Sequence, residues 1–148
     1  MTAVRGRECL GAATSGEIMS LDPVSKMFSW WNEAYRTPGA YTEEAFGIHF
    51  TDDAELIIDG RLVTRGLGGW AKHFQAIQVG GGEVEIVVPF KEVFRVENKV
   101  YTYHLIRANR AGVAMRMLAA GHAIIRDGKI ASISLVRTVL DPSMPDPL

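Results

Sequence analysis

The pattern of hydrophobic positions along the chain changes character near residue 82. Before that point, apolar residues recur three and four positions apart, which is the spacing of one face of an α-helix. This pattern predicts helices over residues 22–37, 42–50 and 67–78. Asp22 and Pro23 mark the start of the first helix, because aspartate caps free backbone N–H groups and proline suits the first helical position.

After residue 82, strand-like runs replace the helical spacing. Four long runs, over residues 83–96, 99–109, 113–125 and 129–140, are separated by short turn-type connections. Upstream, a turn at residues 51–53 precedes a short hairpin, in which strands 54–58 and 61–63 flank the turn signal Asp59-Gly60. Helices first and an antiparallel meander afterwards predict an α+β fold, with the helices covering the apolar face of the sheet.

The composition is that of an ordinary globular domain, with 148 residues, 47% of them hydrophobic and 22% charged. The formal net charge of -1 gives no electrostatic reason to expect nucleic acid or an anionic membrane as a partner. No apolar run approaches the roughly 18 residues of a membrane helix. The single cysteine, Cys9, excludes an intramolecular disulfide and is compatible with a cytoplasmic location.

The chain is predicted to form one domain, over residues 21–141. Residues 1–20 are interpreted as a flexible leader, because their apolar stretch is too short for a signal peptide. Residues 142–148 are interpreted as a flexible tail, because their three prolines prevent continuation of the last strand. Both ends are therefore expected to be dispensable for folding.

Two local passages carry a resemblance to a known superfamily. Residues 50–54, Phe-Thr-Asp-Asp-Ala, look like its entry into the first strand, and residues 126–130, Arg-Asp-Gly-Lys-Ile, look like its turn before the last strand. Together with the order of elements, they resemble the nuclear-transport-factor-2-like superfamily, which includes ketosteroid isomerases, SnoaL-type polyketide cyclases, limonene epoxide hydrolases and scytalone dehydratase. The resemblance implies a cone-shaped, curved antiparallel sheet wrapped around the N-terminal helices, with a small-molecule pocket at its wide end.

No subfamily pattern is complete. His122 stands where the resemblance to ketosteroid isomerase places an acid that holds the oxyanion, but the position of its general base is Ile58, with Asp59 one residue later. His104 resembles a catalytic histidine of scytalone dehydratase, whose essential acid is missing after Tyr35. The limonene epoxide hydrolase triad and the closing-strand acid of the cyclases are also absent.

Strand alternation provides a second route to the same candidates. It places His104 on one face of the 99–109 run, His122 and Arg116 on one face of the next run, and Arg137 with Ile133 on one face of the last. If all these faces are concave, the two histidines meet in one cavity. The candidate catalytic residues are therefore His122, His104 and Asp59, and the candidate substrate-binding residues are Arg137, Trp31, Tyr35, Ile58, Arg116 and Ile133.

Two functions remain open for this pattern. One is a lyase, dehydratase or isomerase that acts on a small cyclic or aromatic apolar substrate, with histidine moving a proton. The other is a non-catalytic module for ligand binding or dimeric assembly. Arg137 suggests an anionic or carbonyl-bearing ligand, or alternatively a salt bridge with Glu55 or Asp59.

No cofactor is expected with either function. Four histidines without close spacing and one cysteine make no recognisable metal-ligand set. A homodimer is expected through the outer face of the sheet, where Tyr101, Tyr103 and Leu105 would form an apolar patch.

Overall fold

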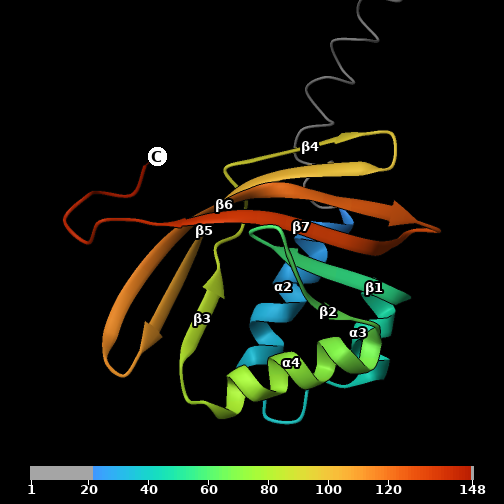
Figure 1. Cartoon of the computed structure of the whole chain (residues 1–148), viewed down its shortest axis with the longest axis horizontal. Coiled ribbons are helices and arrows are strands. Elements are labelled where there is room, and N and C mark those ends of the chain that lie inside the picture. The colour runs from blue at the N-terminus through green and yellow to red at the C-terminus, as the bar shows by residue number, and fades with distance from the viewer. Residues whose placement is uncertain (1–21, 148) are drawn as a thin grey trace, which may run out of the picture.

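The structure is a computed structural model that describes residues 22–147, so the predicted leader (residues 1–20) lies outside the described residues. The described chain is α+β, as the sequence predicts. Helices α2 (Pro23–Tyr35), α3 (Glu43–His49) and α4 (Leu67–Val79) lie together under one side of a curved sheet (Figure 1). Their apolar faces and the concave face of the sheet bury one another.

The sheet has seven strands within the described residues. They are β1 (Phe50–Ile58), β2 (Arg61–Arg65), β3 (Glu83–Ile86), β4 (Glu92–Val96), β5 (Lys99–Arg110), β6 (Val113–Arg126) and β7 (Lys129–Val139). The order is β2-β1-β7-β6-β5-β3, and β4 also pairs with β5. All pairs are antiparallel except β1 with β7, which run parallel. The sequence predicted a wholly antiparallel sheet, and the parallel pair corrects this. No hairpin joins β1 to β7, so no turn signal in the sequence indicates the relative direction of these two strands.

Two element boundaries differ from the sequence prediction. Strand β1 begins at Phe50, which has extended backbone angles, and includes the residues 51–53 that were predicted as a turn. The predicted run over residues 83–96 is divided into β3 and β4. Both strands pair with β5, and the break contains Pro89, whose missing N–H cannot contribute to a ladder.

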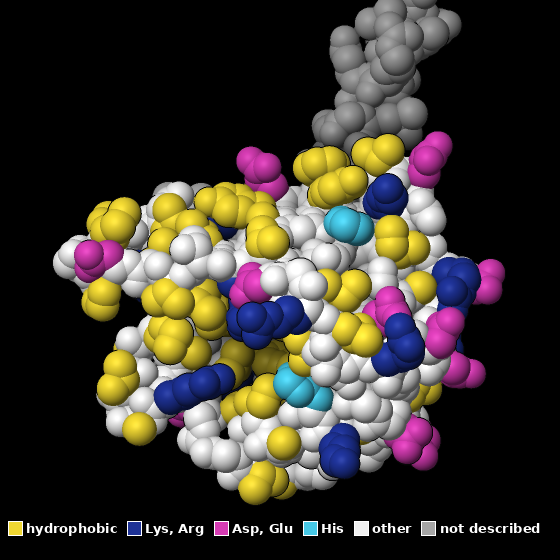
Figure 2. Space-filling view, viewed as in Figure 1, with side chains coloured by type: hydrophobic (Ala, Val, Ile, Leu, Met, Phe, Trp, Pro, Cys, Tyr) yellow, Lys and Arg dark blue, Asp and Glu magenta, His cyan; other side chains and the backbone are white. Residues whose placement is uncertain are grey.

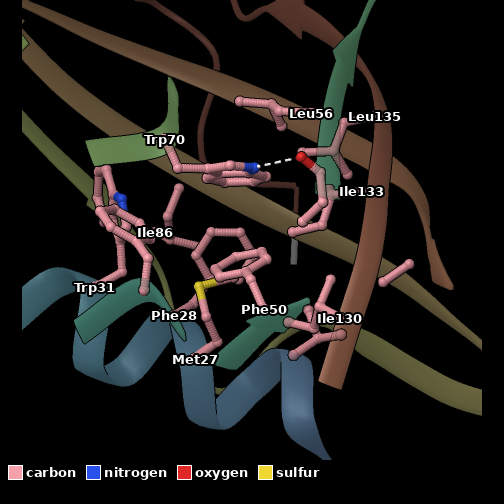
Figure 3. Packing of buried hydrophobic residues seen from close by; sticks show 14 of the residues in the cluster. Met27, Phe28, Trp31, Phe50, Leu56, Trp70, Ile86, Ile130, Ile133 and Leu135 are labelled. Atoms are coloured by element: carbon pink, nitrogen blue, oxygen red, sulfur yellow. Dashed lines mark hydrogen bonds between the residues drawn. The ribbon is translucent and has the colours of Figure 1, made fainter. Parts of the chain in front are cut away.

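The core forms where α2 and α4 meet the first and last strands. Met27, Phe28 and Trp31 of α2 point toward strand residues such as Phe50 and Ile133 (Figure 3). The Trp70 indole of α4 lies on Phe50, with ring centroids 4.2 Å apart, and its Nε1 donates a hydrogen bond of 3.0 Å to the Ala54 carbonyl oxygen. This contact anchors α4 to β1.

Helix α2 begins as predicted. The Asp22 carboxylate accepts hydrogen bonds from the backbone N–H groups of Val24 and Ser25, at 3.0 and 3.1 Å, and from the Ser25 hydroxyl. The predicted hairpin turn is also confirmed. Asp59 and Gly60 both have positive φ, 53° and 82°, as the two central residues of a type I′ turn require.

Gly121 allows strands β6 and β7 to approach closely. A Cβ atom added at this position would overlap the carbonyl oxygen of Ser134 and lie 2.8 Å from the Cα atom of Leu135. Both atoms belong to the backbone of β7, so neither can rotate away. Glycine is therefore the residue that the local sheet geometry accepts.

The outer face of the sheet does not match the apolar patch expected there. Leu105 is only 3% exposed, and Tyr101 and Tyr103 are half-buried. The large exposed side chains on the same side include Phe94, which stacks on Tyr101 with ring centroids 5.2 Å apart, and Val136. Leu105 is therefore a packed residue rather than part of an open surface.

Candidate functional site

A cavity of about 340 Å³ lies between α2, α4 and the concave face of the sheet. In Figure 2 it is a hollow with yellow walls, flanked by two dark-blue side chains and one cyan side chain. Its apolar lining comes from two helices and from the strands, and consists of Phe28, Trp31, Trp70, Phe74, Ile77, Leu56, Ile58, Val84, Ile86, Ile106, Ala108, Met115, Met117, Ile133 and Leu135. Such a lining favours an apolar molecule.

Three charged or ionisable side chains complete this lining: His73, Arg110 and Arg137. Burial lowers the pKa of His73 below its ordinary value, so its imidazole is neutral near pH 7. Arg137 contacts Asp59, whose carboxylate accepts a 2.9 Å hydrogen bond from the Arg137 backbone N–H and lies 3.4 Å from the guanidinium. The salt bridge considered for Arg137 therefore exists, and Arg137 still meets the cavity.

His104 lies on the concave face, as predicted, but not at the cavity wall. The side chain is 0% exposed and stacks on Phe90 with ring centroids 4.8 Å apart, while Phe28 lies 5.9 Å away. Neither ring nitrogen has a hydrogen-bond partner among the described residues. Burial lowers the pKa of His104 to about 4, so the ring is neutral and packs as an aromatic core residue.

The expectation that His104 and His122 share a cavity is wrong. Directly opposed residues of an antiparallel pair point to the same face, and the β5–β6 register opposes His104 to Ala119 but His122 to Tyr101. Tyr101 is three positions from His104 on the same strand, so these two side chains point to opposite faces. His122 points to the same face as Tyr101 and therefore lies on the outer face of the sheet. Its ring centroid is 5.6 Å from that of Tyr101.

Two further predicted site residues belong elsewhere. Arg116 is opposed to Arg107 on the outer face and not at the cavity edge. Its guanidinium donates to Asp146 and to the carbonyl oxygens of Asp141 and Met144, so the described part of the predicted tail contacts the sheet. The Tyr35 hydroxyl donates to the Gly82 carbonyl oxygen beside a second, more polar cleft.

The remaining predicted residues do meet the cavity. Trp31, Ile58 and Ile133 line it, and Asp59 lies at its edge through its contact with Arg137. The indole Nε1 donor of Trp31 is buried and has no hydrogen-bond partner among the described residues.

Sequence reasoning missed His73 and Arg110. His73 stands three positions after Trp70 and four before Ile77, so helical spacing places it on the same face as these two apolar residues. Arg110 has the same strand parity as Ile106 and Ala108, which also line the cavity. Spacing alone could have found both residues.

No helix within residues 22–147 is long and apolar enough to cross a membrane. Over the same range, no three His, Cys, Asp or Glu side chains gather where they could hold a metal ion.

No family model and no curated protein matches the chain. Solved structures do. A nuclear-transport-factor-2-like protein of unknown function from Exiguobacterium sp. 255-15 has a TM-score of 0.62 and 14% identity, with 80% of this chain and 98% of that chain covered. The chain has the nuclear-transport-factor-2-like fold.

Two other structures with the nuclear-transport-factor-2-like fold have names that suggest chemistry. A candidate SnoaL-like polyketide cyclase from Jannaschia sp. CCS1 has a TM-score of 0.58 and 14% identity, over 82% of this chain and 85% of that chain. A candidate ketosteroid isomerase from Kribbella flavida has a TM-score of 0.58 and 11% identity, over 87% and 83%. At these sequence identities, the similarity between this chain and the two proteins concerns the fold alone.

Proposed function

We propose that the protein binds a small, largely apolar molecule in the cavity between α2, α4 and the sheet. The observation that carries the proposal is a cavity of about 340 Å³ with a largely apolar lining. This volume lies within the range of small-molecule sites, roughly 300–1,000 Å³.

A neutral fluorophore, N-phenyl-1-naphthylamine, tests the binding function. Its fluorescence should rise saturably with the wild-type protein because the cavity excludes water from the dye. Ala108 is buried in the cavity wall, so Ala108→Leu fills the space and should weaken binding about tenfold. Ala114 is exposed on the neighbouring strand, and Ala114→Leu is the matched control that should bind normally. Equal binding by both variants would contradict the proposal.

The second candidate is proton transfer on the bound molecule, as in a dehydratase or isomerase. His73 favours this function, because it is an imidazole in the cavity wall and its lowered pKa keeps it in the form that accepts a proton. His104 is less suited to the role, because it is enclosed by Phe28 and Phe90. His122 is on the opposite face.

Hydrogen–deuterium exchange into 2-tetralone, a small cyclic ketone with acidic α-protons, tests the catalytic candidate. The protein should accelerate exchange over buffer, and His73→Gln should remove the acceleration. His122→Gln is the control and should keep it, because this side chain lies on the outer face. Equal rates with and without protein would leave the binding function and refute proton transfer on this ketone class.

A further inference from the structure

We propose that the molecule in the cavity is an amphipathic anion, with its apolar body inside and its negative group at the mouth, beside Arg110 and Arg137. The inference rests on the proposed binding function and adds the charge of the ligand. Neither composition nor net charge indicates it, because the chain as a whole has a formal net charge of -1. The argument depends on where individual charges lie.

The ionisable residues in the cavity wall are basic. Among the described residues, two arginines and one histidine contribute to the lining and no aspartate or glutamate does. The rest of the wall is apolar, so an acidic group on the ligand has no negative side chain in the lining to oppose it. In Figure 2, dark-blue side chains lie on either side of the yellow hollow.

Arg110 carries the first part of the proposal. It is the last residue of β5, its side chain is exposed, and no carboxylate of the described residues lies within 4.0 Å of it. Glu83 is opposed to Asn109, the chain neighbour of Arg110, in the β3–β5 pair, but it forms no salt bridge with this arginine. The guanidinium is therefore open to an anion, which it can bind through two parallel N–H donors.

Arg137 supplies a second, weaker contact. Its guanidinium approaches Asp59 through a single pair of atoms, 3.4 Å apart, which is long for a charged hydrogen bond. Since a guanidinium has five donors, most of them remain available toward the cavity. Asp59 partly neutralises Arg137, and the two arginines are therefore not equivalent.

The position of these charges determines how they discriminate between ligands. Both arginines are exposed to solvent, so a carboxylate beside them keeps part of its hydration and avoids the cost of deep burial. An uncharged ligand with the same hydrocarbon chain gains only the apolar contacts. The acid should therefore bind more tightly than the alcohol.

Displacement of the neutral fluorophore by octanoate and by 1-octanol tests the charge of the ligand. With the wild-type protein at low salt, octanoate should bind about tenfold more tightly than 1-octanol. Arg110→Ala should remove most of this preference, and Arg137→Ala should remove less. Asp59→Asn should increase it, because Asn tolerates the positive φ of 53° at this position and releases Arg137 from its acid.

Arg95→Ala is the matched control. Arg95 is an exposed arginine of β4 that does not line the cavity, so its loss changes the net charge equally and should leave the preference intact. Raising the salt concentration should reduce the preference for octanoate and leave 1-octanol binding unchanged. A thermal melt of each variant verifies that it is folded.

The outcomes separate the two proposals. Equal affinity for acid and alcohol, or tighter binding of the alcohol, overturns the anionic ligand and leaves the binding function. A preference for octanoate that survives in the Arg110/Arg137 double variant also overturns the assignment to these residues. If neither the fluorophore nor 1-octanol binds the wild-type protein, the proposed function fails, and the inference fails with it.

Discussion

Replacing His104 by phenylalanine should make the protein less sensitive to acid. His104 is fully buried, and burial lowers its pKa to about 4 from an ordinary value of 6.5. The unfolded chain takes up a proton at this histidine as the pH falls below 6.5, whereas the folded protein resists protonation until about pH 4. Stability from the neutral ring is thus complete above pH 6.5 and is lost as the pH falls through this window.

The difference of 2.5 units between these two pKa values corresponds to about 3 kcal/mol in the free energy of unfolding, at about 1.4 kcal/mol per unit. His104→Phe removes this contribution, so the difference in stability between variant and wild type should shift by roughly 2 kcal/mol in favour of the variant from pH 7 to pH 4.5. If the larger phenylalanine ring overpacks the core, the cost in stability is the same at each pH. This cost therefore cancels when the stability differences at pH 7 and pH 4.5 are compared. At pH 7 the variant also avoids burying an imidazole without hydrogen-bond partners, and this gain offsets part of any overpacking cost.

Urea unfolding at pH 7, 5.5 and 4.5 measures the effect. Ile106→Val is the control, because Ile106 is buried on the same face and does not titrate. It should cost about 1 kcal/mol at every pH. If His104→Phe changes stability by the same amount at all three pH values, the imidazole titrates normally in the folded protein and the argument from burial is refuted.

Three further predictions concern the sheet and the ends of the chain. Gly121→Ala should abolish or strongly impair folding, because the new Cβ overlaps the backbone of β7; a soluble variant with a wild-type melting temperature would contradict this. The protein should be a homodimer by light scattering, and Val136→Glu on the exposed outer face should yield monomers; an unchanged dimer would place the interface elsewhere. Deleting residues 1–18 should leave the melting temperature unchanged to within about 1 °C, and a loss of several degrees would indicate that the leader packs on the domain.

Most of the fold could be predicted from the sequence, because local signals agree with one another there. The Asp22 cap, the Asp59-Gly60 turn and the alternating strands each depend on neighbours in the chain, and all three are confirmed. The parallel pairing of β1 with β7 was missed, since it joins segments that no local turn connects.

The candidate site was less predictable, because it depends on which face of each strand is concave. Alternation within a strand correctly grouped His122 with Arg116, but it could not relate that group to His104 on the next strand. The register between β5 and β6 determines this relation. Gly121, the neighbour of His122 in the chain, allows the close approach of β7, which also depends on the pairing between strands.

The parallel pairing of β1 with β7 has a consequence for synthesis of the protein. Strand β1 can form its hairpin with β2 as soon as both leave the ribosome, but its other edge is completed only by β7, with Phe50 opposite Ile130. Until then, the nascent chain carries an open strand edge, which can pair with other chains. Chains that terminate before β7 should therefore aggregate, and the yield of folded protein should depend on how quickly translation reaches the last strand.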